Sequence, residues 1–190
     1  MSKLTVGYAL TGSFCTFEKS IEALEALAEK EFNIIPIMSY NAFLQDTRFG
    51  KAGDFRKRIE EICKNEIVAD ITAAEPIGPK KLLDLLIVSP CTGNTLSKLA
   101  SSVADTPVTL AAKSHLRNGR PILLGVSSND SLAACAKNIG SLLSRKHIYF
   151  IPMRQDAPEG KPFSVVCDFE KTYEAALCAL KEEQLQPILI

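Results

Sequence analysis

Small polar residues follow the predicted strands at the points where these strands end. They are Thr11-Gly12-Ser13, Ser39 with Asn41, Pro90 to Thr95, and Ser127-Ser128-Asn129. In an open parallel sheet, ligands bind outside the carboxyl ends of the strands, because the loops from neighbouring strands meet there. We therefore expect one small-molecule site built from these segments.

The first of these segments has the features of an anion-binding turn. Gly12 allows close backbone approach, Ser13 offers a hydroxyl, and the free amides of a following helix favour negative charge. Phe14 completes the turn. The segment matches neither the dinucleotide-binding glycine fingerprint nor the Walker A loop. A tight strand-to-helix turn without any ligand explains it equally well.

The segment from Pro90 to Thr95 is more informative. We expect Pro90 to end a strand, and Thr92, Gly93, Asn94 and Thr95 to place small side chains and several amides at a helix start. Such a surface accommodates a ring edge and a phosphate. Plain helix capping by Asn94 or Thr92 is the alternative.

Cys91, within the same segment, has two open interpretations. A helix amino terminus lowers the pKa of a thiol, which would make Cys91 reactive. A small packing residue against the ligand is the favoured interpretation, because no histidine partner is visible in the sequence.

Hydrophobic periodicity predicts alternating strands and helices along the whole chain. Strands are expected at 4–10, 32–38, 67–71, 84–88, 121–126 and 147–151, and helices near 17–28, 54–64, 95–103, 108–116, 132–143 and 172–183. Residues 127–129 are expected to cap the fifth helix, 39–53 to form a polar loop, and 153–162 to form either a mobile lid or an ordinary surface loop. Strands separated by helices imply a doubly wound α/β fold, Rossmann-like or flavodoxin-like, with a three-layer parallel sheet. We expect one domain over residues 1–190.

Composition narrows the class of partner. Lys plus Arg and Asp plus Glu number 22 each, so we expect no binding to nucleic acid or to an anionic membrane. The 6 cysteines form no CxxC pair or Cys/His cluster, which argues against a metal site. Residues 1–10 do not resemble a secretion signal, and no apolar run is long enough to span a bilayer. We expect a cytoplasmic protein with reduced thiols.

One part of the sequence resembles a motif of the flavoprotein family of FMN-binding cysteine decarboxylases and flavin prenyltransferases. It consists of residues 90–95, followed by Leu96-Ser97-Lys98-Leu99-Ala100 and then by Ala104-Asp105. Thr11-Gly12-Ser13 is similar to the first flavin-phosphate loop of that family, and residues 38–43 to the second. The resemblance implies that FMN contacts residues in both loops and in the motif. These are Gly12, Ser13, Phe14, Ser39, Pro90, Cys91, Thr92, Gly93, Asn94, Thr95 and, as a weaker candidate, Ser128.

Within that family, the sequence most resembles the branch that supplies one subunit of dipicolinate-making synthases. The characteristic segments are 74–79, 89–95, 105–108, 112–121, 128–130 and 148–158. This resemblance implies a spore-forming bacterium and an oxidoreductase in which the chain works beside a separate, NADP-binding A subunit. The implied substrate is a small dicarboxylate, a dihydro- or hydroxytetrahydro-dipicolinate. A homo-oligomer with flavin sites near subunit contacts is also implied.

The sequence departs from the neighbouring enzymes of the family. Residues 43–79 contain no histidine, although the decarboxylases use one there, and no substrate-clamping segment is recognisable near Cys167. The late Tyr/Arg phosphate-binding pattern of the prenyltransferases is also missing. No general acid or base can be named, and Lys80 and Arg154 are candidates to meet the dicarboxylate. A stand-alone decarboxylase or prenyltransferase-like enzyme and a flavin-free scaffold for the A subunit stay open as alternatives.

Overall fold

A seven-stranded sheet forms the centre of the protein in the computed structural model, which describes residues 3–30 and 32–190. The strands are β1 (Leu4–Leu10), β2 (Phe32–Met38), β3 (Leu85–Cys91), β4 (Ile122–Ser128), β5 (Ile148–Phe150), β6 (Met153–Gln155) and β7 (Val165–Cys167). Their order in the sheet is β2-β1-β3-β4-β7-β6, and β5 also pairs with β4. The strands from β1 to β5 are parallel, whereas β7 is antiparallel to both β4 and β6.

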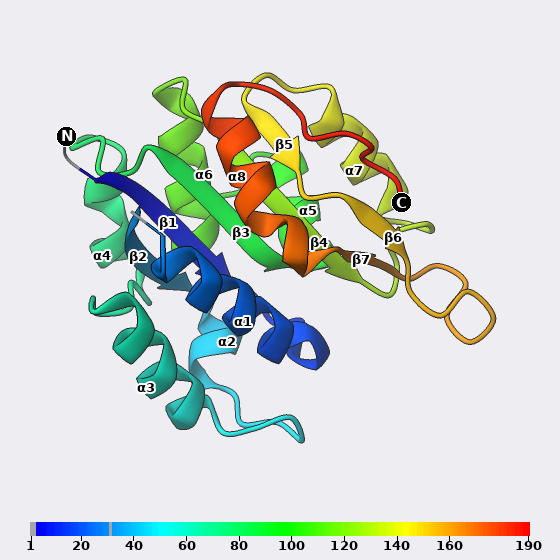
Figure 1. Cartoon of the computed structure of the whole chain (residues 1–190), viewed down its shortest axis with the longest axis horizontal. Coiled ribbons are helices and arrows are strands. Elements are labelled where there is room, and N and C mark those ends of the chain that lie inside the picture. The colour runs from blue at the N-terminus through cyan, green and yellow to red at the C-terminus, as the bar shows by residue number, and fades with distance from the viewer. Residues whose placement is uncertain (1–2, 31) are drawn as a thin grey trace.

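Helices cover both faces of the sheet (Figure 1). They are α1 (Phe17–Ala28), α2 (Tyr40–Leu44), α3 (Ala52–Cys63), α4 (Ile71–Ala74), α5 (Gly93–Ala100), α6 (Pro107–Arg117), α7 (Ala136–Leu143) and α8 (Thr172–Leu180), with short 3-10 turns at Phe14–Thr16, Glu75–Ile77 and Phe169–Lys171. The side chains of α1, α3 and α8 pack into one hydrophobic cluster, and those of α4 to α7 into a second cluster on the opposite face. The result is a three-layer α/β fold.

β3 shows why the parallel strands form where they do. Every residue from Leu85 to Cys91 is buried, as expected for a central strand covered on both faces by helices. Leu85 and Ile87 contribute to the cluster on the α1 face, and Leu86 and Val88 to the opposite cluster. The alternation of side chains along one uniformly apolar strand therefore supplies both cores.

β4 has different neighbours along its two halves, so the sheet forks. Its first half pairs in parallel with β5, from Ile122 opposite Ile148 to Leu124 opposite Phe150. Its last residues pair in antiparallel fashion with β7, where Ser127 lies opposite Val166. The hairpin of β6 and β7 thus extends only the carboxyl end of the sheet, and the segment between them projects from the body (Figure 1).

The structure confirms the doubly wound α/β class and corrects several elements predicted from the sequence. No strand forms at 67–71: Val68 makes a single bridge to Ile37, and Asp70 instead caps α4 by accepting from the Ala73 amide at 2.8 Å. The predicted loop 39–53 contains α2 and the first residues of α3.

Two further corrections concern the carboxyl end of β4 and the segment after β5. Residues 127–129 do not cap a helix, because β4 continues through Ser128 and α7 begins only at Ala136, after turns over 129–135. The segment 153–162 is not simply a loop, since it opens with β6 and leads into the antiparallel hairpin. Among the residues that the structure describes, no helix has the length and hydropathy needed to cross a membrane.

Candidate functional site

Thr11 joins the carboxyl ends of β1 and β3 through hydrogen bonds. Its hydroxyl donates to the Pro90 carbonyl oxygen at 2.7 Å and accepts from the Thr92 amide at 3.0 Å. Because β1 has β2 on one side and β3 on the other, the connections after β1 and β3 leave on opposite faces of the sheet. Such a reversal of strand order opens a crevice at the carboxyl ends, where ligands of this fold class bind.

A cavity of about 150 Å³ lies at this crevice, and we call it the switch-point cavity. It is lined by Thr11, Gly12, Ser39, Tyr40, Asn41, Thr92, Asn94, Thr95, Lys98 and Thr106. Of the residues predicted to bind a cofactor, the cavity brings together Gly12, Ser39, Thr92, Asn94 and Thr95. The ends of β1, β2 and β3 therefore converge on one site.

Two helices begin at the wall of this cavity. The Thr92 hydroxyl caps α5 by accepting from the Thr95 amide at 3.2 Å. Thr106 and Thr109 form a reciprocal capping box at the start of α6, in which each hydroxyl accepts from the other residue's amide at 3.1 Å. The amino ends of helices carry partial positive charge, so both helices favour an anion in the cavity.

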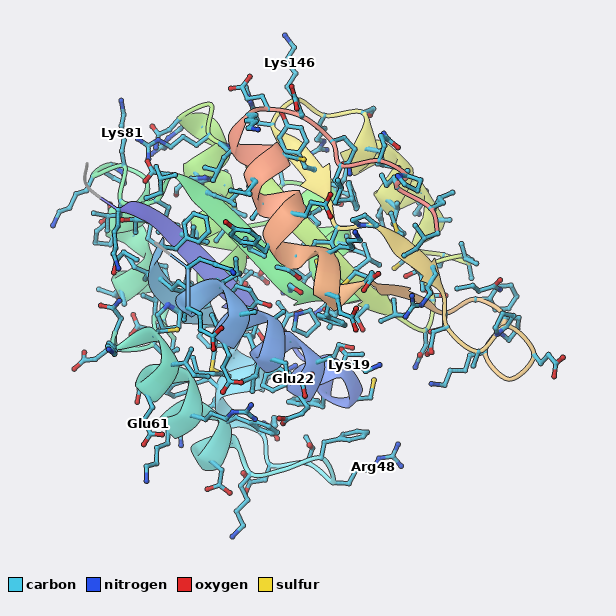
Figure 2. The ribbon with its side chains drawn as sticks, in the orientation of Figure 1. Lys19, Glu22, Arg48, Glu61, Lys81 and Lys146 are labelled. Atoms are coloured by element: carbon cyan, nitrogen blue, oxygen red, sulfur yellow. The ribbon has the colours of Figure 1, made fainter. Side chains whose placement is uncertain are left out.

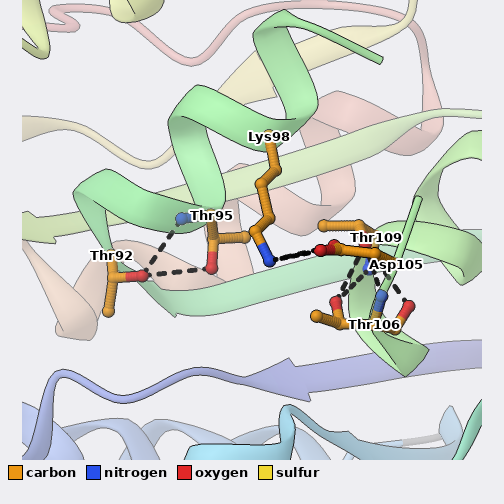
Figure 3. A network of polar contacts seen from close by, with 6 residues as sticks. All are labelled: Thr92, Thr95, Lys98, Asp105, Thr106 and Thr109. Carbon is orange, nitrogen blue, oxygen red and sulfur yellow. Dashed lines mark hydrogen bonds and ion pairs between the residues drawn. The ribbon is translucent and has the colours of Figure 1, made fainter. Parts of the chain in front are cut away.

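Lys98 contributes a full positive charge to the same cavity (Figure 3). It extends from α5 toward the start of α6, and its Nζ lies 2.9 Å from both carboxylate oxygens of Asp105. The hydrogen bond from Lys98 lowers the pKa of Asp105 below its usual range. The ion pair holds the ammonium group beside Thr106, so the cavity has a positioned cation next to two helix starts.

A second group of hydroxyls lies between α1 and the end of β4, and we call it the hydroxyl cluster. It consists of Ser13, Thr16 and Ser127, with Ser127 Oγ 2.9 Å from Ser13 Oγ and 3.0 Å from Thr16 Oγ1. Thr16 also donates to the Ser13 carbonyl oxygen at 3.0 Å. The predicted residue Ser13 therefore belongs to this cluster, adjacent to the switch-point cavity through Gly12.

Gly93 lies against the end of β4. A Cβ atom at Gly93 would come within 2.8 Å of both Ser128 Oγ and Cys135 Sγ. Backbone and side chains are thus in close contact here, and only glycine fits without displacement of its neighbours. Ser128, the weaker candidate, lies beside the α5 start through this contact, and its Oγ also accepts from the Asp130 amide at 3.3 Å.

Phe14, Pro90 and Cys91 form the apolar part of the predicted set. The Phe14 ring lies 5.6 Å from that of Phe17, and its edge is the nearest contact for a Cβ atom at Gly12. Pro90 and Cys91 are buried as the last residues of β3, which continues past the predicted strand end at 88. Burial raises the pKa of Cys91 far above its ordinary value. The full burial of Cys91 favours a packing role over a reactive thiolate.

Several residues at the site were not singled out from the sequence: Thr16, Tyr40, Lys98 and Thr106. Lys98 follows Asn94 by four residues, so both lie on one face of α5, and this spacing was a usable signal. Thr106-Pro107 followed by Thr109 is a capping pattern, but its position beside the cavity depends on tertiary packing.

The two candidates for contact with a dicarboxylate lie at different ends of the sheet. Lys80 belongs to the turn that precedes β3, at the amino ends of the strands, so the structure places it away from the site. Arg154 lies in β6, in register with Val166 and through it with Ser127 at the carboxyl end. The prediction for Lys80 is wrong on position, whereas Arg154 lies at the correct end.

The donor set suits an anionic group such as a phosphate better than a metal ion. Hydroxyl, amide and ammonium groups dominate the cavity, and these donate hydrogen bonds to phosphate oxygens. Small residues leave its walls open, including Gly12 and the neighbouring Gly93. Over the described ranges 3–30 and 32–190, no group of three or more His, Cys, Asp or Glu side chains is arranged to hold a metal ion.

Comparison with known proteins agrees with this geometry. The family model named Flavoprotein matches residues 1–176. The chain belongs to the flavoprotein family. It is 41% identical to the dipicolinate synthase B subunit of Bacillus subtilis (strain 168) over 185 residues, which cover 97% of this chain and 92% of the relative. The resemblance to this branch is thereby confirmed.

Solved structures place the fold in the same family. The crystal structure of the dipicolinate synthase B subunit from Bacillus halodurans C superposes with a TM-score of 0.90 at 40% identity, covering 100% of this chain and 98% of the other. An FMN-dependent cysteine decarboxylase, TvaF from thioviridamide biosynthesis, superposes with a TM-score of 0.63 at 19% identity, covering 94% and 99%. The second comparison shows the shared fold alone.

Proposed function

We propose that this chain is the flavin-binding B subunit of a dipicolinate synthase. The observation that carries the proposal is the switch-point cavity, where two helix starts, Lys98 and three strand ends provide donors for an anion. Membership of the flavoprotein family and the 41% identity to a B subunit support it. FMN is the proposed cofactor, and NADP is assigned to the partner A subunit.

The switch-point cavity is the proposed place for the FMN phosphate, with Gly12, Ser39, Thr92, Asn94 and Thr95 as its contacts and Lys98 as its cation. The ring would extend toward the hydroxyl cluster, past Ser13, Phe14, Pro90, Cys91, Gly93 and Ser128. The width of the sheet supports this direction, because β1 and β4 lie about 10 Å apart at a strand spacing of ~4.8 Å. When bound, the flavin supplies redox chemistry that amino-acid side chains lack.

The residues of this chain are suited to binding and orientation rather than to proton transfer. Lys98 is the one charged side chain among the described residues that line the switch-point cavity, and it is paired with Asp105. A dihydrodipicolinate loses two hydrogens to become dipicolinate, and a hydroxytetrahydro precursor must also lose water. We assign the final acceptor of those hydrogens to the NADP that the partner A subunit holds.

The cellular setting is part of the same proposal. We propose that the chain forms a homo-oligomer and acts with the A subunit in the cytoplasm of a sporulating cell, as the B-subunit branch implies. The two purified proteins, tested singly and together, should make dipicolinate only as the mixture. Full activity of the A subunit without flavin and without this chain would instead support the scaffold alternative, and turnover of a carboxylated thiol by this chain alone would support the decarboxylase.

The absorption spectrum of the purified chain tests the flavin directly. After incubation with FMN and removal of free ligand, we expect a retained flavin band. Asn94→Asp should abolish retention, because it adds a negative charge beside the proposed phosphate. Asn33→Asp is the matched control, since exposed Asn33 lies near the amino end of β2 and the same charge there should leave retention unchanged. Equal retention by wild type and Asn94→Asp would contradict the proposed phosphate position.

A further inference from the structure

The antiparallel hairpin places the cationic side chain of Arg154 in the same cross-strand row as Ser127 of the hydroxyl cluster. Ser127 of β4 lies opposite Val166 of β7, and Val166 lies opposite Arg154 of β6. Residues directly opposite each other in a sheet share a face, so Ser127 and Arg154 lie on the same face, about 10 Å apart across two strand spacings. This row continues the carboxyl-end site outward from the position proposed for the flavin ring.

Arg154 also lines a cavity of about 270 Å³ between α1 and the connection from β7 to α8. Lys19 and Glu22 of α1 form its other wall and project from the same stretch of that helix (Figure 2), whereas Val166 of β7 lines the cavity beside Arg154. Because Val166 lines this cavity and lies opposite Ser127, and Lys19 follows Thr16 by three residues, the cavity lies near the hydroxyl cluster. The hydroxyls, Lys19 and Arg154 therefore face adjoining spaces at one end of the sheet.

Among the residues that the structure describes, none forms a hydrogen bond or an ion pair with the guanidinium group of Arg154. Across the residues that the structure describes, no carboxylate lies within 4.0 Å of it, whereas Arg58 and Arg120 are both paired. Asp168 lines the cavity as well, but its carboxylate accepts from the Glu170 amide at 3.2 Å and caps the turn there. An unpaired guanidinium presents several donors in a planar fork that matches a carboxylate.

We propose that Arg154 is the residue that recognises a carboxylate of the substrate, next to the flavin ring. The inference rests on the proposed function, because it takes the ligand to be a pyridine-type dicarboxylate. The hydroxyl cluster would bind the ring and one carboxylate, and Arg154 would bind the second carboxylate. Lys19 supplies additional positive charge at the same cavity, which the carboxylates of Glu22, Asp168 and Glu170 also line.

Binding of dipicolinate and of picolinate, which lacks one carboxylate, tests the role of Arg154. Titration of the FMN-loaded chain by calorimetry should show tighter binding of dipicolinate in the wild type. Arg154→Gln should weaken dipicolinate binding at least about tenfold and leave picolinate within a few-fold, because the charge-assisted pair that is lost involves the second carboxylate, which picolinate lacks. Arg154→Lys should restore part of the discrimination. Arg117→Gln is the control, since it removes an exposed arginine at the far end of α6.

The outcomes separate this inference from the flavin proposal. FMN retention is measured on every variant, and Arg154→Gln should retain FMN as the wild type does. Normal retention with an unchanged ratio of dipicolinate to picolinate affinity would overturn the role of Arg154, and so would a wild type that binds no dipicolinate. A chain that retains no FMN but binds dipicolinate in an Arg154-dependent manner would support the carboxylate site and contradict the flavin.

Discussion

The two ends of the sheet both carry buried and half-buried polar groups, but they use them differently. At the amino ends of the strands, Asp84 accepts from the Thr5 amide at 2.8 Å and pairs with Arg120 at 3.4 Å. Arg120 also donates to the Leu83 carbonyl oxygen. Charged groups there are joined to one another and to the backbone, so their hydrogen-bonding capacity is used within the protein.

At the carboxyl ends, small neutral groups predominate. Thr11, Ser39, Thr92 and Asn94 surround the switch-point cavity, and Lys98 is the charged side chain among its described lining residues. The Ser39 and Thr92 hydroxyls each cap a helix and the Thr11 hydroxyl joins two strands, whereas the Asn94 amide adds further hydrogen-bonding groups at the cavity. We conclude that a polar network whose groups are all hydrogen-bonded within the protein has a structural role. A network that keeps unpaired donors where the strand order reverses indicates a ligand-binding site.

The largest expected effect is at the carboxyl end, with Ser39→Asp. Aspartate still caps α2, as Ser39 does by accepting from the Ala42 amide, but it places a negative charge in the cavity proposed for the phosphate. We expect FMN affinity to fall at least about 100-fold, or roughly 3 kcal/mol, in a fluorescence titration. Ser39→Asn, a neutral capping variant, should stay within a few-fold of wild type. Similar losses in both variants would point to disrupted capping instead.

The next largest effect is the pH dependence of folding stability that arises from His115, near the amino ends of the strands. Burial lowers the pKa of His115 to about 4, and its Nε2 lies 2.9 Å from the Pro121 carbonyl oxygen, to which the neutral ring donates. The unfolded chain binds the proton near pH 6.5, so stability is fully present above this pH and declines as pH falls toward 4, by roughly 2–3 kcal/mol. The free energy of unfolding in urea, compared between pH 7 and pH 4.5, measures this decline. His115→Gln should reduce this pH dependence, whereas His147→Gln should retain it.

Arg120→Gln should have a smaller effect, and it should distinguish folding stability at the amino ends of the strands from FMN binding at the carboxyl ends. Loss of the contacts with Asp84 and the Leu83 carbonyl should lower the free energy of unfolding by about 1–2 kcal/mol in urea. FMN affinity should not change, because these groups lie at the opposite end of the sheet. A parallel loss of FMN affinity would show that the two ends are energetically coupled.

Lys98→Gln should have the smallest effect. We expect FMN affinity to fall roughly threefold to tenfold and to become less sensitive to salt, because one partly exposed cation is removed. Asp105→Asn breaks the same ion pair but keeps the positive charge, so affinity should be unchanged or higher. Equal losses in the two variants would mean that the ion pair itself, rather than the charge on Lys98, supports the site.

The parallel strands could be predicted closely from the sequence. The predicted strands 4–10 and 32–38 match β1 and β2, because each is an apolar run bounded by clear breaks. The hairpin of β6 and β7 was missed, since its two short strands flank a polar segment rich in Pro and Gly, unlike the apolar run that predicted β5. The false strand at 67–71 had suitable residues, but Asp70 offered the backbone a helix cap instead.

The candidate site was predictable to the level of its loops. The residues at the strand ends lie where the parallel topology places them, although their contacts with FMN stay a prediction. The separation of Ser13 from Ser39 into the hydroxyl cluster and the switch-point cavity was not predictable, because it depends on how α1 meets the end of β4. The four-residue spacing from Asn94 places Lys98 on one face of α5, but its position beside Asp105 and Thr106 depends on the packing of α5 against α6 (Figure 3).

The fork in β4 has a consequence for how such a protein diversifies. Ile122 to Leu124 bond to β5, whereas Ser127 and Ser128 bond to β7, so the hairpin attaches to the sheet through only the last residues of one strand. Insertions or substitutions in the hairpin leave the parallel pairs of β1, β2 and β3 untouched. Descendants of one ancestral scaffold can therefore exchange the surface that selects a substrate while they inherit the remaining strand ends unchanged.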